Sequence, residues 1–438
     1  MKAWRALTTR ARLTTPELHD GFCSPRSKGV GKLLPQRDLG ERVRRLRLVA
    51  GIGQVEFAER LGVANGSVSK IENGRMPVSD DLLEQMANVL DCTPAFLTAR
   101  ELVGPTTRPW LRAYADASKK TVDQQAADCT TAVEVSEILG LRRMPDSIPV
   151  FDGDLSDDDA IEQFALDVRA AAQLGESDVV GNAIRAAERL GCFVLPMRSE
   201  LGKHLGLSVR ANLIPVLCVA RAAAENSHDG VPGDRQRFTV AHELGHLGLH
   251  AGLGPPESAH DASRVEKQAH HFAGAFLGPG DALLQDLREE GNRVTLRTLA
   301  ILKERWGISI KALVMRFQGL GVVDSDQARS LYKQISARGW NKSEPIEVGG
   351  EDAIWLQRAI KQISADAPDS LKFASKTAGI GLSYLHRWTQ WEAPEENSPD
   401  TARVLAMRQQ PRKRPSPRSV DAAPQKAMIV SLPARRNR

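Results

Sequence analysis

The sequence of 438 residues is poor in aromatic side chains, in cysteine and in long apolar runs. Aromatic residues make up only 5%, so we expect cores built mainly from Leu, Val, Ile and Ala. The five cysteines are scattered and without Cys-x-x-Cys spacing, which argues for a reducing cytoplasm and against disulfides or a cysteine metal site. Because no uncharged apolar stretch reaches about 18 residues and no secretory signal is present, no membrane partner is expected.

Basic residues are concentrated at the two ends of the chain. Residues 1–38 hold eight Lys and Arg against three Asp and Glu, and residues 408–438 hold nine against one. The body between them is therefore acidic, although the net charge is +5. Basic arms contact nucleic acid or simply stay solvated, and both roles remain open. A start codon assigned too far upstream is a third explanation for residues 1–38.

Residues 39–98 have the pattern of five short helices joined by turns. Apolar residues recur at helical spacing in the first helix, which Gly51 closes, and Ser79 is placed to cap the fourth. A short helix, a tight turn and another short helix within this stretch predict a helix-turn-helix unit. A helical module for protein contact or dimerisation is the alternative interpretation.

The same stretch resembles the phage-repressor-like (XRE-type) helix-turn-helix family. The resemblance is carried by Gln54, Ala58, Leu61-Gly62-Val63, Val68-Ser69-Lys70-Ile71-Glu72, Asn73-Gly74 and Pro77. It implies double-stranded DNA as a partner, with the third helix lying in the major groove. On this alignment the residues that face DNA are Asn65, Gly66, Ser67, Ser69 and Lys70, with Gln54 and Arg75 near phosphates.

This domain is roughly neutral, with seven basic and eight acidic residues over 39–98. DNA affinity is therefore expected to depend on the arginines of the first helix, Arg42, Arg44, Arg45 and Arg47, or on the basic arms. Because repressor-like domains bind two half-sites as dimers, a homodimer is also expected.

The remainder of the chain predicts a mostly helical α+β fold. After a connector at 99–155, the core at 156–280 begins with two helices, and three apolar runs at 192–220 predict a small three-stranded sheet. Helical regions follow at 281–345 and 346–392, with helix-turn-helix shapes at 296–318 and 371–388 to which we assign no DNA contact. The Pro-, Arg- and Ser-rich composition predicts a disordered basic tail at 393–438.

Residues 237–250, RFTVAHELGHLGLH, contain two histidines four positions apart. In a helix, His242 and His246 lie on one face about 6 Å apart along the axis, so both can bind one ion. Glu243 is positioned to take a proton from a water on that ion, as in His-Glu-x-x-His zinc peptidases. The helix is apolar almost all round, and buried histidines are costly without partners. A hydrogen-bonded histidine pair without a metal is the alternative.

A catalytic zinc needs a third protein ligand. His250 lies about 12 Å from His242 along the helix axis, so it is expected behind the site and not on the metal. The next helix offers Glu266 and His270. A carboxylate directed at a core is costly unless it binds something, which makes Glu266 a candidate, with His270 as its rival or as a partner behind it.

Together, these motifs resemble the ImmA/IrrE family of zinc endopeptidases over about residues 155–345. The matching residues are Arg237-Phe238-Thr239, Ala241 through His246, His250, Glu266-x-x-Ala269-x-x-Phe272-Ala273, Pro279, Leu302-Lys303, Trp306-Gly307, Ser309 and Gly339-Trp340. The resemblance implies a zincin-like domain with His242, His246 and Glu266 as metal ligands. At His270 the family often has asparagine, so contact between His270 and the metal stays open. Two histidines and a carboxylate also suit Mn²⁺ or Fe²⁺.

This resemblance implies a cytoplasmic regulatory protease that cleaves a helix-turn-helix repressor and so derepresses genes of a mobile element or a stress response. We predict a DNA-binding regulator that hydrolyses such a partner, or itself near the 99–155 connector. The alternative is a non-proteolytic regulator or antitoxin-like protein whose metal site is structural or sensory. Glu243 argues against that alternative, because a structural site does not need this carboxylate.

Overall fold

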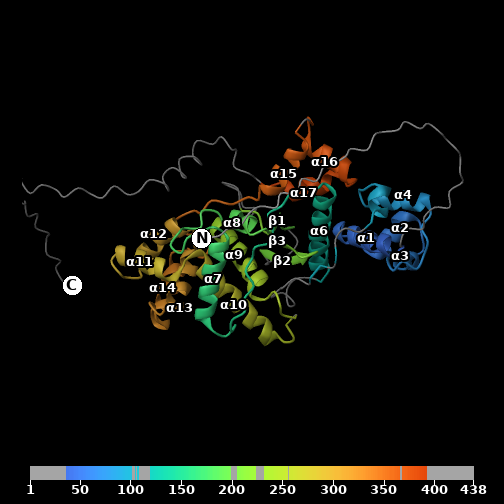
Figure 1. Cartoon of the computed structure of the whole chain (residues 1–438). Helices are drawn as coiled ribbons and strands as arrows, with labels where there is room; N and C mark the ends of the chain where they lie inside the picture. The colour runs from blue at the N-terminus through green and yellow to red at the C-terminus, as the bar shows by residue number, and fades with distance from the viewer. Residues whose placement is uncertain are drawn as a thin grey trace, which may run out of the picture.

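Figure 1 shows the computed structural model of the chain, which describes residues 36–100, 104, 106–107, 119–198, 205–222, 231–254, 256–365 and 367–391. Within these residues, helices α1 to α17 surround one three-stranded sheet, so the predicted, mostly helical α+β fold is confirmed. The tail predicted at 393–438, and all but the last three residues of the arm predicted at 1–38, lie outside the described residues. No helix in the described part of the chain is long and apolar enough to cross a membrane.

The N-terminal domain is the predicted five-helix unit. Its helices are α1 (Gln36–Val49), α2 (Gln54–Leu61), α3 (Asn65–Glu72), α4 (Asp80–Val89) and α5 (Pro94–Thr98). Ser79 caps α4 by accepting a hydrogen bond from the Leu82 amide, and Gly62 ends α2 in the left-handed conformation. Leu46, Phe57 and Met86 are among the side chains that form its buried core.

The sheet contains β1 (Phe193–Pro196), β2 (Gly206–Ala211) and β3 (Ile214–Val219) in the order β1-β3-β2, as predicted for 192–220. β1 runs parallel to β3, and β2 runs antiparallel to it. Successive side chains point to opposite faces and enter two separate cores. Val194, Leu217 and Val219 enter one core, and Phe193, Leu195, Leu207, Val209 and Val216 enter the other.

One face of the sheet is covered by α6 (Lys119–Ile138), which also packs against α1 (Figure 1). This helix occupies part of the stretch that we expected as a connector. Other parts of the protein cover α6 on several sides, and its buried residues are polar as well as apolar. The sequence of α6 therefore lacks the single apolar stripe of a surface helix. Its polar side chains are paired instead: Gln125 donates to the Cys218 sulfur, and Asp128 accepts from Trp388.

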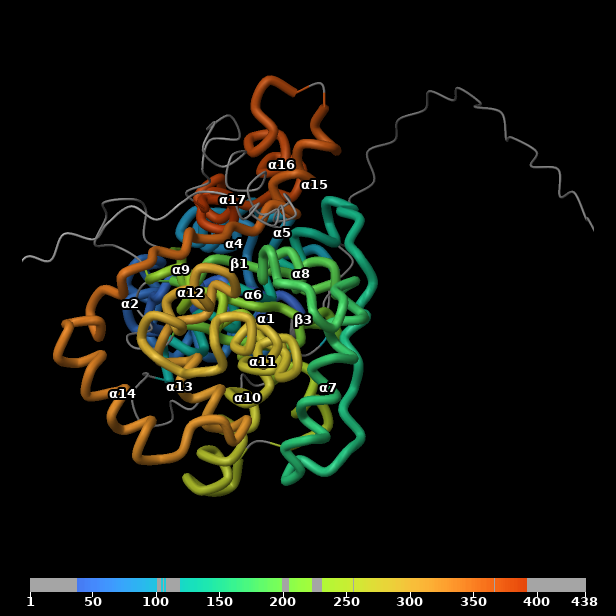
Figure 2. The backbone as a smooth tube through the Cα atoms, turned by 90° about the vertical axis from the view of Figure 1, so that its left-hand side faces the viewer, coloured from blue at the N-terminus to red at the C-terminus, as the bar shows by residue number. Residues whose placement is uncertain are grey.

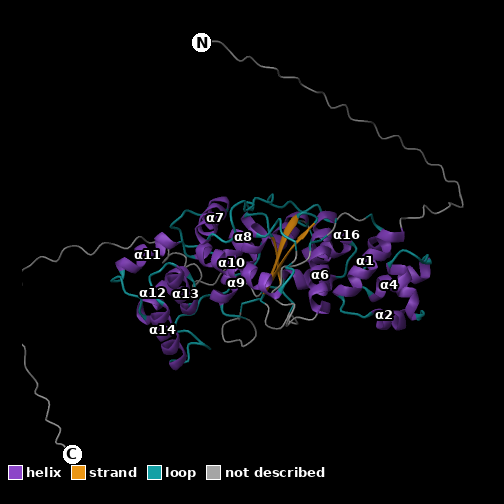
Figure 3. Ribbon diagram, turned by 90° about the horizontal axis from the view of Figure 1, so that it is seen from below, coloured by secondary structure: helices purple, strands orange, loops and turns teal. Residues whose placement is uncertain are grey.

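The other face is covered by the helices of the predicted peptidase core. These are α7 (Asp158–Ala171), α8 (Ala183–Arg189), α9 (Gly233–Leu249) and α10 (Ala259–Leu277), of which α9 contacts both β2 and β3. Beyond α10 lie α11 (Gly280–Glu289), α12 (Leu296–Trp306), α13 (Ile310–Gly319) and α14 (Ser325–Ala337). Figure 3 shows the result as an elongated arrangement, with the N-terminal domain at one end and α11–α14 at the other. Figure 2 views it from the α11–α14 end.

The last helices turn back toward the N-terminal domain. They are α15 (Trp355–Ile363), α16 (Ser370–Ala378) and α17 (Leu382–Thr389), of which α16 and α17 form the helix-turn-helix shape noted at 371–388. The Thr93 amide donates to the Gly379 carbonyl (2.8 Å), and the Tyr384 hydroxyl donates to the Leu90 carbonyl (2.9 Å). This shape therefore joins the α4–α5 corner to the rest of the chain.

Candidate metal centre and DNA-binding surface

The candidate metal centre lies where α9 crosses α10. Two glycines of α9 allow neighbouring helices to approach closely: a Cβ on Gly245 would lie 2.9 Å from the ring of Phe272 in α10. A Cβ on Gly248 would lie 2.8 Å from the ring of Phe164 in α7. Both contacts are shorter than van der Waals packing allows. The absence of side chains here brings α10 against the histidine face of α9.

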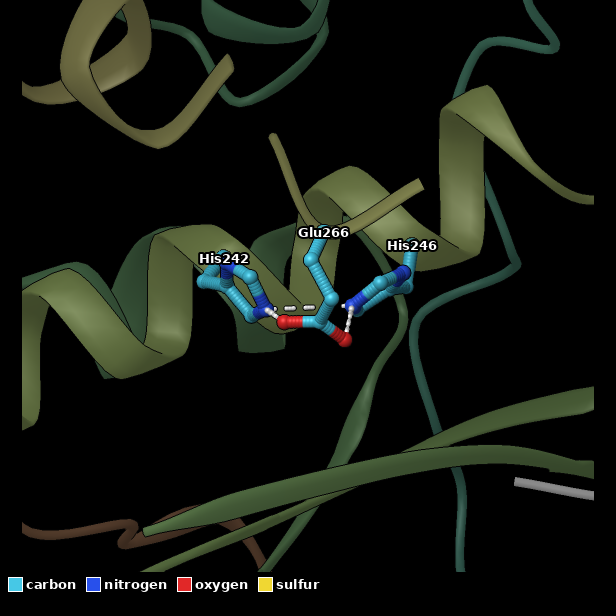
Figure 4. Close-up of side chains that lie close together, drawn as sticks. All are labelled: His242, His246 and Glu266. Atoms are coloured by element: carbon cyan, nitrogen blue, oxygen red, sulfur yellow. Dashed lines mark hydrogen bonds and ion pairs between the residues drawn. The ribbon is translucent and has the colours of Figure 1, made fainter. Parts of the chain in front are cut away.

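At this crossing, His242 and His246 of α9 face Glu266 of α10 (Figure 4). The Nε2 atoms of the two histidines are 3.0 Å apart. The Glu266 carboxylate oxygens lie 3.4 Å from His242 Nε2 and 3.6 Å from His246 Nε2. Within the described residues, this trio is the cluster of His, Cys, Asp and Glu whose ligand atoms converge.

The spacing of these three donors fits a metal ion. A tetrahedral zinc site with bonds of about 2.0–2.1 Å holds its ligand atoms about 3.3–3.4 Å apart. The observed separations are close to that value: 3.0 Å between the two Nε2 atoms, 3.4 Å from His242 Nε2 to Glu266 Oε2, and 3.6 Å from His246 Nε2 to Glu266 Oε1. Two imidazole nitrogens and one carboxylate oxygen also form a donor set that zinc accepts while leaving a position for water. The residues present therefore fit the group.

The charge of Glu266 depends on the two histidines. Burial raises the pKa of this carboxyl, but interactions with the adjacent His242 and His246 side chains outweigh burial, and the pKa lies well below its ordinary value. Glu266 is therefore ionised at neutral pH and supplies the negative charge that a divalent cation needs.

Glu243 lies beside the trio and is held by the sheet. Its side chain is buried, and its Oε2 atom accepts a hydrogen bond of 2.6 Å from the Ser208 hydroxyl of β2. The strand approaches this closely because residue 206 is glycine: a Cβ there would lie 2.4 Å from Thr239 and 2.8 Å from Glu243 Oε1. Ser208 is not among the predicted site residues, although its position between Leu207 and Val209 puts it on the opposite face of the strand, toward α9.

His250 lies behind His246 and not in the trio. The Nδ1 atoms of the two rings are 3.0 Å apart, and His250 Nε2 lies 3.1 Å from Gln268 Oε1 of α10. His250 is fully buried, which lowers the pKa of its ring to about 3, with the neighbouring His246 acting in the same direction. The ring is therefore neutral at pH 7.

His270 is also next to the trio without joining it. Its Nδ1 donates to the Glu266 backbone carbonyl (2.9 Å), and its ring stands edge-on to the His242 ring, with centroids 4.6 Å apart. His271, the next residue along α10, is half-buried and lies 2.8 Å from Glu162. Glu162 in turn pairs with Arg316, so this second histidine belongs to a separate ion-pair cluster.

The predicted DNA-binding residues lie on and around α3. Asn65, Gly66 and Lys70 are exposed, as are Gln54 and Arg75, whereas Ser67 and Ser69 are half-buried. The space around a Cβ at Gly66 is open. Gln54 donates to Glu72 (2.7 Å), so its side chain is anchored at the start of α2.

The expected role of the α1 arginines in DNA affinity is wrong for three of the four. Arg42 and Arg45 are buried and both bind Glu134 of α6, and Arg47 is buried and binds Glu72 (2.5 Å). These charges hold the domain together and join it to α6, so they do not face a nucleic acid. Arg44 is exposed.

Two segments of the chain match known protein families. Residues 38–99 match a helix-turn-helix domain family, and residues 187–318, which contain the metal-site trio, match the IrrE N-terminal-like domain of the peptidase M78 family. No curated relative matches the chain. The protein thus joins a segment similar to DNA-binding domains to a segment similar to a metallopeptidase domain. The two matches come in the order expected for a helix-turn-helix domain fused to an ImmA/IrrE domain.

Proposed function

We propose that this protein is a DNA-binding transcriptional regulator with zinc-dependent endopeptidase activity. The observation that carries the proposal is the convergence of His242, His246 and Glu266 at zinc-like spacing, with Glu243 alongside. When bound, zinc supplies a Lewis acid that lowers the pKa of water to about 7 and polarises a peptide carbonyl.

The protein's own residues transfer the proton, position the base and exclude water. Glu243 Oε1, the oxygen that does not accept from Ser208, takes the proton of the attacking water and later delivers it to the amine nitrogen of the leaving peptide. Ser208 fixes the position of this carboxylate through its hydrogen bond to Oε2. The apolar helices α7 and α10 exclude bulk water from the histidine side, where His246 is 1% exposed.

For the substrate, we propose another helix-turn-helix repressor or the connector of this chain. The choice of the connector as a substrate is supported by its contact with β2, the strand that contains Ser208. The Thr107 amide donates to the Arg210 carbonyl (2.9 Å), and Thr106 forms an antiparallel bridge with Ala211. Residues 106 and 107 of the connector thus already bond to this edge strand, and pairing with a sheet edge is one way in which a protein binds a peptide.

Cleavage by wild type and by Glu243→Gln, with equal zinc content verified, tests the enzymatic half. Candidate repressors encoded nearby and the inactive full chain itself serve as substrates, and each cleaved bond is mapped. We expect cleavage by the wild type and by the exposed control Glu304→Gln, and none by Glu243→Gln. Equal cleavage by all three would remove the assigned mechanism and favour a regulator with a structural or sensory metal.

For DNA, we propose that α3 reads the major groove through Asn65, Gly66, Ser67, Ser69 and Lys70, with Gln54 and Arg75 on phosphates, and that the chain binds as a homodimer in the cytoplasm. Lys70→Ala and Arg75→Ala should weaken binding to the promoter region of its own gene and reduce the salt dependence. Lys361→Ala, an exposed change on α15, serves as the control. DNA affinity that is equal in all of these proteins would contradict this surface.

A further inference from the structure

A chain of polar groups runs from α10 to the back of His246. The Gln268 amide nitrogen donates to the Leu155 carbonyl (2.8 Å), and Gln268 Oε1 lies 3.1 Å from His250 Nε2. His250 Nδ1 in turn lies 3.0 Å from His246 Nδ1. Gln268 and His250 are both buried. Neither residue belongs to the metal-site trio, so their arrangement calls for a separate explanation.

The Leu155 carbonyl sets the direction of this chain. Because a carbonyl only accepts, the Gln268 NH₂ group must point to it, and the Gln268 oxygen must then face His250. That oxygen also only accepts, so His250 Nε2 carries the hydrogen. The neutral His250 ring is left with an acceptor at Nδ1.

The same reasoning reaches the metal-site histidine. Since His250 Nδ1 accepts, His246 Nδ1 must donate, and the lone pair of the neutral His246 ring is then on Nε2. Nε2 is the atom that faces His242 and Glu266. Resting on the proposed metal site, we infer that Gln268 is a positioning residue, which acts through His250 to fix the tautomer of His246 and aim its lone pair at the metal.

The other histidine of the trio has no such support. His242 Nδ1 is buried and has no hydrogen-bond partner within the described residues. The structure therefore presets one imidazole and leaves the second to be oriented by the ion and by Glu266. This asymmetry gives an internal comparison within one site.

The tautomers can be read directly by NMR of the metal-free full chain labelled with ¹⁵N-histidine, with resonances assigned by His246→Gln and His250→Gln. We expect His246 as the Nδ1–H form and His250 as the Nε2–H form in the wild type. In Gln268→Met, which keeps the length of the side chain and removes the acceptor, both should become mixtures. His246 in the Nε2–H form, or tautomers unchanged in Gln268→Met, would overturn the inference.

Zinc affinity, measured by competition with a chelator, gives the second readout. Loss of an outer partner of a metal-binding histidine costs about 10- to 100-fold in affinity, and we expect a loss in that range for Gln268→Met. The matched control is Gln236→Met, because Gln236 is a buried glutamine of α9 that bonds the Ala220 and Glu351 carbonyls and no histidine. We expect this control to bind zinc within about twofold of the wild type, as for a site that is distant and independent. Equal losses in the two variants would reveal general destabilisation and overturn the inference.

A double variant tests whether Gln268 acts through His250. In His250→Asn, the amide oxygen replaces the Nδ1 acceptor and the link to Gln268 is cut. Adding Gln268→Met should then cause no further loss of zinc affinity, whereas an additive loss would contradict the relay. If the wild type bound no zinc, the proposed function would be wrong, but the tautomers of His246 and His250 would still test whether Gln268 acts through His250. If Gln268→Met bound zinc as tightly as the wild type, the positioning role of Gln268 would be wrong and the proposed metal site would be unaffected.

Discussion

Two buried glutamates, one on each side of the sheet, have opposite surroundings. Glu134 of α6 is fully buried and binds the guanidinium groups of Arg42 and Arg45. Glu266 of α10 is 12% exposed and faces two histidines at 3.4 and 3.6 Å, which exceed the usual length of a charge-assisted hydrogen bond. The Glu134 carboxylate contacts two arginines, which are always positively charged. The Glu266 carboxylate lies farther from two histidines, whose rings can be neutral.

The difference separates a structural cluster from a binding site. A buried carboxylate that is fully paired with arginines needs no further cation, and its removal would leave the arginines unpaired. A carboxylate and two imidazoles that converge without an arginine or lysine partner can still bind a metal cation. Arg42, Arg45 and Arg47 of α1 are paired in the same way within the chain, so their charges stabilise the fold.

The largest effect should come from Glu134→Gln. Because this change leaves Arg42 and Arg45 buried beside a neutral amide, we expect a loss of about 3–5 kcal/mol in the free energy of unfolding, measured with urea. The control is Glu137→Gln on the same helix, whose carboxylate is 39% exposed and pairs with Arg143. There, the loss should be about 0–1 kcal/mol. Similar small losses in both variants would show that the Glu134 cluster is not the structural tie described above.

A smaller change in stability, with a larger one in activity, is expected for Gly206→Ala. The new methyl group meets Thr239 and Glu243, so overpacking should cost about 1–3 kcal/mol. Because Glu243 must shift, cleavage of the identified substrate should fall by about 100-fold while zinc remains bound. Gly319→Ala, where the added Cβ meets open space, is the control for both measurements. Unchanged cleavage in Gly206→Ala would contradict the role of β2 in positioning Glu243.

The smallest effect concerns Glu162, which is paired like Glu134 but is partly exposed. Burial raises its pKa, but hydrogen bonds from His271 and Arg316 outweigh burial and lower the pKa to about 2. A carboxyl with a lowered pKa stabilises the fold fully above its unfolded value of 4.5, and this contribution disappears as the pH falls toward 2. The stability difference between wild type and Glu162→Gln should therefore shrink between pH 4.5 and 2 in urea unfolding. A difference that stays constant with pH would contradict the pairing.

The sequence was most informative where the spacing within one helix decides the geometry. The His-Glu-x-x-His spacing places His242 and His246 together, and the cost of a carboxylate on an apolar helix face points to Glu266.

It was least informative where a partner lies far along the chain. Arg42 looks like a surface charge until α6 is known, because Glu134 is 92 residues away. α6 itself lacks an apolar stripe because its polar side chains are paired from several directions. Ser208 and Gln268 were missed for the same reason: each is an ordinary polar residue until the fold brings a site residue to it.

The central claim is that the Glu266 cluster binds a metal and the Glu134 cluster does not need one. Calorimetric titration of the metal-free full chain with zinc tests it directly. We predict one ion per wild-type chain, retained in the control His271→Gln one residue beyond His270, and no saturation in Glu266→Gln at the concentration that saturates the wild type. No zinc uptake by the wild type, or equal uptake by Glu266→Gln, would contradict the account.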